Sequence, residues 1–181
     1  MADAQRKDPA RSSWYVDDAF YDRLIADFTG FDRDDREIDD AAERDRHRRL
    51  IEREARILDG HRYDDWLAMF APECLYWAPA TPAVGDPRRE VAVFFDDRRR
   101  MEDRVHRLRS PYAWSQAPVS RTVRLVTNCE VFATDRPGVR IVRSTFLVTE
   151  LRAGDTRRLT GWNAHRVAEQ GGRLSIEVKQ V

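Results

Sequence analysis

Cysteine, histidine and lysine are scarce in this chain. Its 181 residues include two cysteines and four histidines, and the only lysines are Lys7 and Lys179. Cys74 and Cys129 each stand alone in an apolar segment, which is typical of buried reduced thiols in a cytoplasmic protein, so we expect no disulfide. Two compatible explanations account for the preference for arginine: codon bias in a GC-rich genome, and planar guanidinium groups at ion-paired interfaces.

Long apolar runs are missing as well. No stretch approaches the roughly 18 uninterrupted apolar residues of a membrane helix, and the charged segment 1–11 lacks the apolar run of a secretory signal. Acidic and basic residues balance at 32 each. A neutral chain without a basic patch interleaved with aromatic residues is not expected to bind nucleic acid or an anionic membrane. We therefore expect a cytoplasmic protein.

Ligand patterns for metals and nucleotides are also lacking. A Rieske iron–sulfur site needs two cysteines that are each closely followed by a histidine, and neither cysteine here has one. The four histidines stand in different segments, without a metal-ligand spacing such as i, i+4: His47, His61, His106 and His165. No glycine-rich loop leads into a helix, and no serine occupies a nucleophile elbow. We expect no metal or cofactor in this chain, and we place His47 on a solvated helix face.

Residues 1–40 are predicted to form an acidic N-terminal arm. The first 45 residues contain 14 acidic and 7 basic side chains. Apolar residues recur at helical spacing over 17–28, which predicts a short amphipathic helix capped by Asp17 or Asp18. Two placements of this helix remain open: against its own domain, or against a neighbouring subunit.

Residues 41–181 are predicted to form one α+β domain. Helices are expected over 40–59, over 63–70, and from a cap at Asp96-Asp97 through Leu108. Strands are expected over 74–78, 91–95, 121–133, 139–151, 156–168 and 174–178, the last four as an antiparallel meander. Alternation in the first long strand puts Val123, Leu125, Cys129 and Val131 on one side. Helices before strands suggest a curved sheet with helices on one face.

Such a fold offers one enzymatic possibility. A helical lid over a cupped sheet can enclose an apolar pocket in which a buried carboxyl or imidazole acts as acid or base. The candidates to line it are His61, Tyr63, Asp65 and Tyr76, with His106 or His165 opposite. The simpler interpretation is that Asp64-Asp65 form the polar side of the helix that contains Trp66.

Two segments carry a more specific pattern. The first is Glu54-Ala55-Arg56-Ile57-Leu58-Asp59, followed by Tyr63-Asp64-Asp65-Trp66-Leu67, Phe70-Ala71 and Tyr76-Trp77-Ala78-Pro79. The second is Asp96-Asp97, Arg104-Val105-His106-Arg107-Leu108, the run 113–122 with its Trp…Pro-x-Ser-Arg-Thr block, and Asn128. Over about residues 45 to 180 the chain resembles the small (β) subunit of bacterial aromatic-ring-hydroxylating (Rieske-type) dioxygenases.

The resemblance implies a cystatin-like, nuclear-transport-factor-like cone of curved antiparallel sheet and helices. Family members assemble with a large α subunit, commonly as an α3β3 hexamer. That subunit carries the Rieske 2Fe–2S cluster and a mononuclear Fe(II), and electrons reach it from NADH through a reductase and often a ferredoxin. The complex adds both atoms of O2 to an aromatic ring to give a cis-dihydrodiol. This chain is then a structural subunit without catalytic residues.

The residues that the resemblance marks for subunit contact or local structure are Trp66, Arg104, Arg107, Trp114, Pro118, Ser120, Arg121 and Asn128. An aromatic anchor beside arginine is typical of a protein–protein hot spot; the alternative for Arg121 is an internal ion pair. Gln116 stands where an acidic residue is expected, the acidic arm is outside the pattern, and we expect a further tail after Val181. Two other functions remain: a free-standing dehydratase or isomerase using His61, Asp65 and Tyr63, and a small-ligand or adaptor module.

Overall fold

The structure, a computed structural model, describes residues 17–80, 86–109 and 117–181; the expected contact residue Trp114, Gln116 and the first 16 residues of the arm lie outside these ranges. The helices are α1 (Asp18–Phe28), η2 (Asp34–Arg36), α2 (Ala41–Asp59), α3 (Tyr63–Leu67) and α4 (Arg98–Arg109). The strands are β1 (Phe70–Pro79), β2 (Ala92–Asp97), β3 (Arg121–Ala133), β4 (Val139–Arg152), β5 (Asp155–Gln170) and β6 (Arg173–Gln180).

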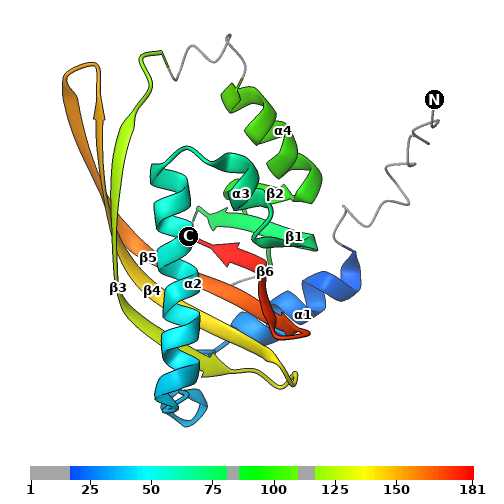
Figure 1. The fold of residues 1–181 in the computed structure, drawn as a ribbon. Coiled ribbons are helices and arrows are strands. Elements are labelled where there is room, and N and C mark those ends of the chain that lie inside the picture. The colour runs from blue at the N-terminus through cyan, green and yellow to red at the C-terminus, as the bar shows by residue number, and fades with distance from the viewer. Residues whose placement is uncertain (1–16, 81–85, 110–116) are drawn as a thin grey trace, which may run out of the picture.

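The described strands form a six-stranded sheet in the order β2-β1-β6-β5-β4-β3 (Figure 1). Strands β3 to β6 form the expected antiparallel meander, and the α+β class is confirmed. The sheet is not antiparallel throughout, because β1 and β6 pair in parallel. Local patterns indicate a strand but carry no signal for the direction of a partner more than 100 residues away, so this pairing was not predicted.

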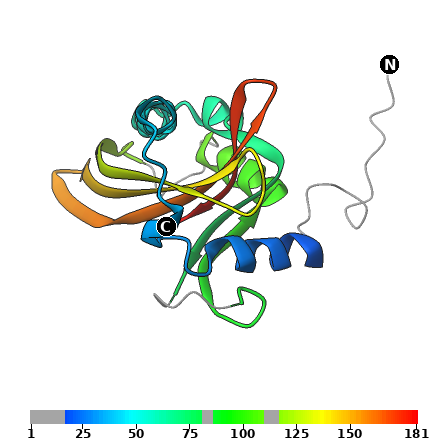
Figure 2. The ribbon, with the colours of Figure 1, turned by 90° about the horizontal axis from the view of Figure 1, so that it is seen from below.

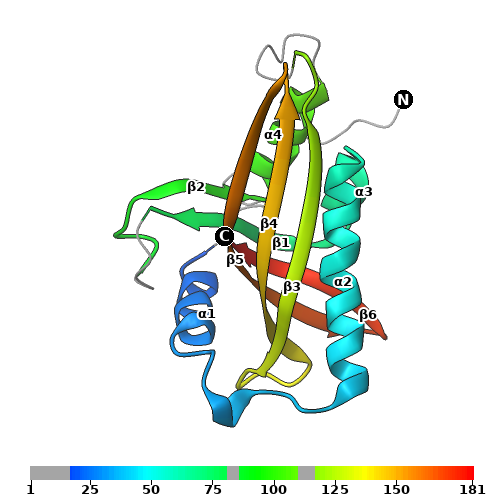
Figure 3. The same ribbon diagram turned by 90° about the vertical axis from the view of Figure 1, so that its left-hand side faces the viewer.

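The helices cover both faces of the sheet, not one face as expected. Neighbouring strand residues point to opposite faces. Ile141 of β4 packs with Leu24 and Phe28 of α1, whereas the next residue, Val142, packs with Ile51 of α2. Figures 2 and 3 show α1 and α2 on opposite sides of the sheet. Helix α1 thus packs on its own sheet; the domain boundary at residue 40 stays a prediction.

The predicted helix ends follow from local capping chemistry. Asp17 accepts a hydrogen bond of 2.8 Å from the Phe20 amide, and Asp40 accepts one of 2.7 Å from the Glu43 amide. Each carboxylate satisfies an amide that has no partner inside the first turn of its helix. Gly60 caps the C-terminus of α2 as expected.

The expected solvated position of His47 is wrong. His47 is buried, and its Nδ1 lies 2.9 Å from the Glu43 carbonyl oxygen. Positions 47, 51 and 54 recur at i, i+4 and i+7 and therefore lie on one helix face. Because α2 lies lengthwise against the sheet, this face is covered along with the apolar stripe.

The helix expected over 63–70 is shorter in the structure. Helix α3 ends at Leu67, and Phe70 already begins β1, which contains Pro72. The pairing of β1 with β6 is irregular between Phe70 and Leu75. Pro72 therefore lies where the ladder is interrupted, and its missing N–H breaks no regular pair.

A β-bulge in β3 reverses the expected orientation of half the strand. The register passes from Thr127↔Thr145 to Glu130↔Arg143, so three steps on β3 match two on β4. Asn128 has a φ of 49° at this point. Val123 and Leu125 are consequently 60% and 59% exposed, whereas Val131 is buried. The four residues expected on one side lie on two.

Substitutions at Asn128 test this bulge. Asparagine tolerates the left-handed conformation better than a β-branched residue, which is strained there by about 1–2 kcal/mol. We expect Asn128→Val to lower the free energy of unfolding by this amount, and Asn128→Gly to leave it within about 0.5 kcal/mol. Urea denaturation measures both. Equal stability of the two variants would contradict the bulged conformation.

Candidate functional site

A buried ionic cluster joins α2, α3 and the last two strands. Glu54 of α2 is only 2% exposed. Its Oε1 accepts hydrogen bonds from Trp66 Nε1 (2.8 Å) and Lys179 Nζ (2.9 Å), and its Oε2 lies 3.0 Å from His165 Nε2. His165 and Lys179 are direct partners in the β5–β6 ladder, so both side chains leave the same face of the sheet. The cluster satisfies the requirement that a buried charge be paired.

The protonation states in the cluster follow from burial and pairing. Burial alone would raise the pKa of Glu54, but the charge of Lys179, together with the hydrogen bonds from His165 and Trp66, outweighs it and holds the pKa below its usual value. Burial lowers the pKa of His165, and this effect exceeds the attraction of Glu54. At neutral pH, Glu54 is therefore ionised and His165 is neutral. A carboxylate bound this firmly to a cation is a poor proton acceptor.

A cavity of about 210 Å³ lies next to the cluster. Its polar lining consists of Glu54, Tyr76, Arg124, Asn163 and Lys179, and the rest is mainly aliphatic. Burial raises the pKa of Tyr76 to about 12, so the phenol is neutral.

Arg124 is fixed in the wall of this cavity by Asp59. The Arg124 amide donates a hydrogen bond of 2.8 Å to Asp59 Oδ2, and the two side chains form an ion pair. Thr122 Oγ1 donates to Asp59 Oδ1 at 2.9 Å. The charge of Arg124 is therefore already compensated inside the protein.

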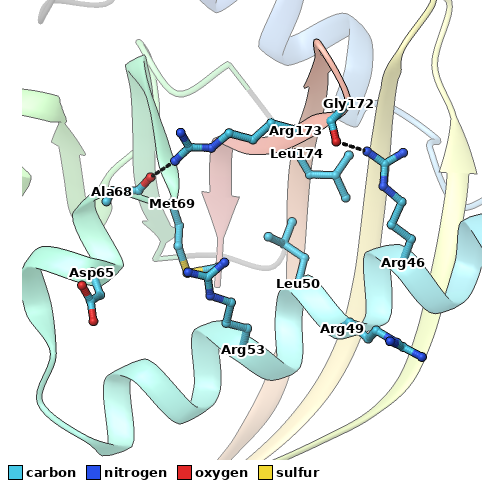
Figure 4. Close-up of a pocket in the computed structure, with 10 residues that line it drawn as sticks. All are labelled: Arg46, Arg49, Leu50, Arg53, Asp65, Ala68, Met69, Gly172, Arg173 and Leu174. Carbon is cyan, nitrogen blue, oxygen red and sulfur yellow. Dashed lines mark hydrogen bonds between the residues drawn. The ribbon is translucent and has the colours of Figure 1, made fainter.

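A larger cleft of about 430 Å³ lies between α2 and the β5–β6 turn (Figure 4). Arginines from both sides line it: Arg46, Arg49, Arg53 and Arg173. Arg46 donates to Gly172 O at 2.8 Å, and Arg173 donates to Ala68 O at 3.2 Å. Among the residues that line this cleft none is a buried titratable group. The smaller cavity is therefore the better candidate for binding a small molecule.

The residues expected to line an acid–base pocket are separated in the structure. His61 Nδ1 lies 2.9 Å from the Tyr63 hydroxyl, away from the smaller cavity. Asp65 is exposed, forms an ion pair with Arg62 at 3.3 Å, and lines the arginine-rich cleft. Of the six candidates only Tyr76 lines the smaller cavity; His165 lies behind Glu54, and His106 is exposed.

The residues marked for subunit contact fall into two groups. Trp66 and Ser120 are buried, and Arg104 donates to Asp96 Oδ2 at 2.8 Å. The exposed members are Arg107, Pro118, Arg121 and Asn128. The first group is buried or makes contacts inside this chain, whereas the second lies on its surface.

Two residues of the cluster, Glu54 and Lys179, were not predicted as site residues. Glu54 falls within the buried stripe of its helix, where an unpaired carboxylate is rarely found. Lys179 is one of two lysines in a chain that otherwise uses arginine. The carboxylate on a buried helix stripe and the rare lysine were the sequence features from which this cluster could have been inferred.

The cysteines and histidines do not provide a Rieske ligand set within the described part of the chain. Burial raises the pKa of Cys74 to about 12 and that of Cys129 to about 11. Cys74 Sγ contacts Met101 Sδ at 3.8 Å. In residues 17–80, 86–109 and 117–181, no three His, Cys, Asp or Glu side chains group so that they could hold a metal ion. No helix in these ranges is long and apolar enough to cross a membrane.

Comparison with known proteins agrees with this architecture. The family model described as "Ring hydroxylating beta subunit" matches residues 53–181. The 2-halobenzoate 1,2-dioxygenase small subunit of Burkholderia cepacia is 41% identical over 87 residues, 45% of this chain and 53% of that protein. The small oxygenase component of the p-cumate 2,3-dioxygenase system of Pseudomonas putida is 30% identical over 133 residues, 72% of this chain and 73% of that protein.

A structural comparison supports the same fold. A chain of naphthalene 1,2-dioxygenase with indole bound superposes with a TM-score of 0.69 at 19% identity, covering 92% of this chain and 87% of that chain. The expected cone of curved sheet and helices is confirmed. The chain spans about half of the halobenzoate subunit's length.

Stability should fall on mild acidification because two histidines are buried in neutral form. The pKa values of His165 and His47 both lie below the ordinary 6.5. The unfolded chain therefore binds these protons first, and the free energy of unfolding decreases as the pH falls below 6.5, by at most about 1.4 kcal/mol per pH unit for each histidine. Glu54 adds to the loss below its ordinary pKa of 4.5.

Unfolding of the wild type and two variants at pH 7, 6 and 5 tests this dependence. We expect His165→Gln to reduce the slope by about half, since one of the two buried histidines is removed. His106→Gln, at an exposed position, should leave the slope unchanged. An unchanged slope in His165→Gln would show that folding does not lower the pKa of His165.

Proposed function

The chain belongs to the ring hydroxylating beta subunit family, and from that premise we propose that it is the non-catalytic structural subunit of a multicomponent aromatic-ring-hydroxylating dioxygenase. The complex is cytoplasmic and cis-dihydroxylates an aromatic compound with O2 and electrons from NADH. Its Rieske 2Fe–2S cluster and mononuclear Fe(II) belong to the large subunit, to which a reductase or ferredoxin delivers electrons. The contribution of this chain is to hold that subunit in an assembly.

The observation that carries the proposal is an uncovered apolar area on the α1 side of the sheet. Val123 and Leu125 pair with Thr149 and Leu147 of β4, and the odd-numbered residues of β4 share the face of Ile141. Helix α1 covers the Ile141 end, while β3, β4 and β5 run well beyond it (Figure 3). No described helix covers the far end, where Val123 and Leu125 are exposed.

We assign this far end to contacts between copies of the chain, as a trimer within a hexamer of three large and three small subunits. An apolar centre bordered by arginine is the usual anatomy of a protein interface. Pro118, Val119 and Arg121 continue the exposed surface at the start of β3. This placement gives Pro118 and Arg121 the contact role that the sequence motif suggested, and Arg121 is exposed, which favours contact over an internal ion pair.

The large subunit is assigned to the arginine-bearing surfaces. Arg107 is exposed on α4, and four arginines line the cleft of Figure 4. Guanidinium groups suit ion pairs across an interface better than ammonium groups do, because their planar fork matches a carboxylate. In this proposal, the preference for arginine over lysine reflects subunit binding in addition to codon bias.

Acid–base turnover by a free-standing enzyme has less support. The candidate bases His61 and Asp65 do not line the smaller cavity, and Glu54 is held as an ion pair.

Co-expression with a Rieske-type large subunit from the same genome tests the assignment. We expect a stable brown complex in which both chains copurify, with iron and acid-labile sulfide in the large chain after the subunits are separated. A colourless chain that never associates with any such subunit would contradict the proposal.

The interface assignment is tested by placing a charge on the far end of the sheet. Val123→Asp would bury an unpaired carboxylate in the contact, so we expect self-association to weaken roughly a hundredfold. Val93→Asp is the matched control, because Val93 of β2 is 73% exposed outside this area. Sedimentation velocity should give a trimer for wild type and Val93→Asp, and a monomer for Val123→Asp. A trimer in all three would move the contact elsewhere.

A further inference from the structure

The cavity of about 210 Å³ beside Glu54 has no role in the assembly proposed above. It lies between α2 and the face of the sheet opposite to the one that carries Val123 and Leu125. Leu159 lines it and is 58% exposed, which places Leu159 at the rim, whereas Glu54 and Lys179 are buried at its inner end. The cavity thus has an entrance, apolar walls and a polar end.

Some hydrogen-bonding groups that face this cavity are not used within the described part of the chain. Asn163 is only 7% exposed, no hydrogen bond joins its side-chain amide to another described residue, and the amide borders the open space of the cavity. The Tyr76 hydroxyl also forms none, and Lys179 uses one of its three N–H donors for Glu54. An amide at the wall of a cavity is satisfied by water or by a polar group of a bound molecule. An oxygen atom from a bound molecule could accept hydrogen bonds from Asn163 and Lys179 together.

The charge balance restricts what can bind. Lys179 is neutralised by Glu54, Arg124 by Asp59, and His165 is neutral. A charged ligand would therefore enter the cavity without a counterion and lose its hydration. A molecule with one uncharged acceptor oxygen meets the free donors at no such cost.

The volume of the cavity restricts the size of the molecule that can bind. An apolar protein cavity of about 150 Å³ accommodates benzene, so about 210 Å³ suffices for one ring with a short substituent. Phe146, Val126 and Val148 supply the apolar walls.

We propose that this cavity is a binding site for a neutral single-ring molecule that carries one carbonyl or hydroxyl oxygen. The ring lies between Val126, Phe146 and Val148, and the oxygen accepts hydrogen bonds from Asn163 and Lys179. The site belongs to this chain alone and is independent of a large subunit.

Calorimetric titration of the full chain with three ring compounds of equal size tests the ligand class. Acetophenone has the required oxygen, α-methylstyrene replaces it with a methylene group, and benzoate carries a charge. We expect acetophenone to bind one per chain with a dissociation constant below about 1 mM, α-methylstyrene to bind about fivefold more weakly, and benzoate not to bind. Equal binding of benzoate, or no binding of acetophenone, would overturn the proposal.

Variants locate the site. Val126→Phe fills the cavity and should weaken acetophenone binding at least about tenfold, and Leu159→Phe at the rim provides a second blocking change. Val93→Phe, on an exposed valine, is the control and should bind as the wild type does. Circular dichroism establishes that each variant is folded. Unchanged affinity in both folded blocking variants would place binding elsewhere.

The hydrogen bond is tested by combining a variant with two ligands. Asn163→Leu should lower the affinity for acetophenone about fivefold and leave that for α-methylstyrene unchanged. An equal loss for both ligands would mean that Asn163 shapes the cavity without bonding the oxygen, and would overturn its assigned role.

Discussion

The Glu54 carboxylate, buried between α2 and the sheet, is the constraint on which the interior of this protein depends. A carboxylate removed from water is tolerated only when cations and hydrogen-bond donors surround it. Three elements each supply one partner of Glu54: Trp66 comes from α3, His165 from β5 and Lys179 from β6. Shifting β6 would leave Glu54 and Lys179 unpaired, at a cost of about 3–5 kcal/mol, and shifting α3 or β5 would remove a hydrogen bond to a buried carboxylate. The cluster thereby fixes where α2 lies on the sheet.

This constraint also explains why a cavity persists beside the cluster. An apolar core closes around its own side chains, since voids forfeit contacts. Here, Glu54 and Lys179 form the polar end of the cavity, and their ion pair fixes the positions of both side chains. Strand β5 places Asn163 two residues before His165 on the same face. The helix cannot move closer to the strands without disturbing the ion pair. The ion pair of Glu54 and Lys179 therefore accounts both for the cavity and for the unused hydrogen-bond donors that face it.

Local chemistry made the helices predictable, whereas the sheet depended on distant partners. The caps at Asp17 and Asp40 act within three residues, so the ends of α1 and α2 could be read from the sequence. The parallel pairing of β1 with β6 joins segments far apart in the chain. The bulge at Asn128 is a single residue in an otherwise regular alternation. The alternating pattern around Val123 and Leu125 does not show that their side chains point to the face opposite to that of Val131.

The candidate site was predicted only in part for a similar reason. Tyr76 and His165 were among the candidates, but acid–base reasoning favoured His61 and Asp65, which lie close to each other in sequence and outside the cavity. The residues that shape the site, Glu54 and Lys179, are 125 positions apart and meet only through the fold. Their pairing could be inferred from the sequence only by asking what neutralises a carboxylate on a buried helix stripe.

The two faces of the sheet differ in how their charged side chains are paired. On the face of α1, Val123 and Leu125 lie beside Arg121 and, through the β4–β5 register, Arg158, so an apolar centre has a cationic border. On the opposite face the charges are paired internally around the cavity. A surface with unpaired arginines selects partners of complementary charge, whereas an interior with balanced charge selects neutral ligands. Because the bulge at Asn128 decides which β3 side chains reach each face, one backbone irregularity separates the face that we propose for subunit contact from the face that holds the cavity.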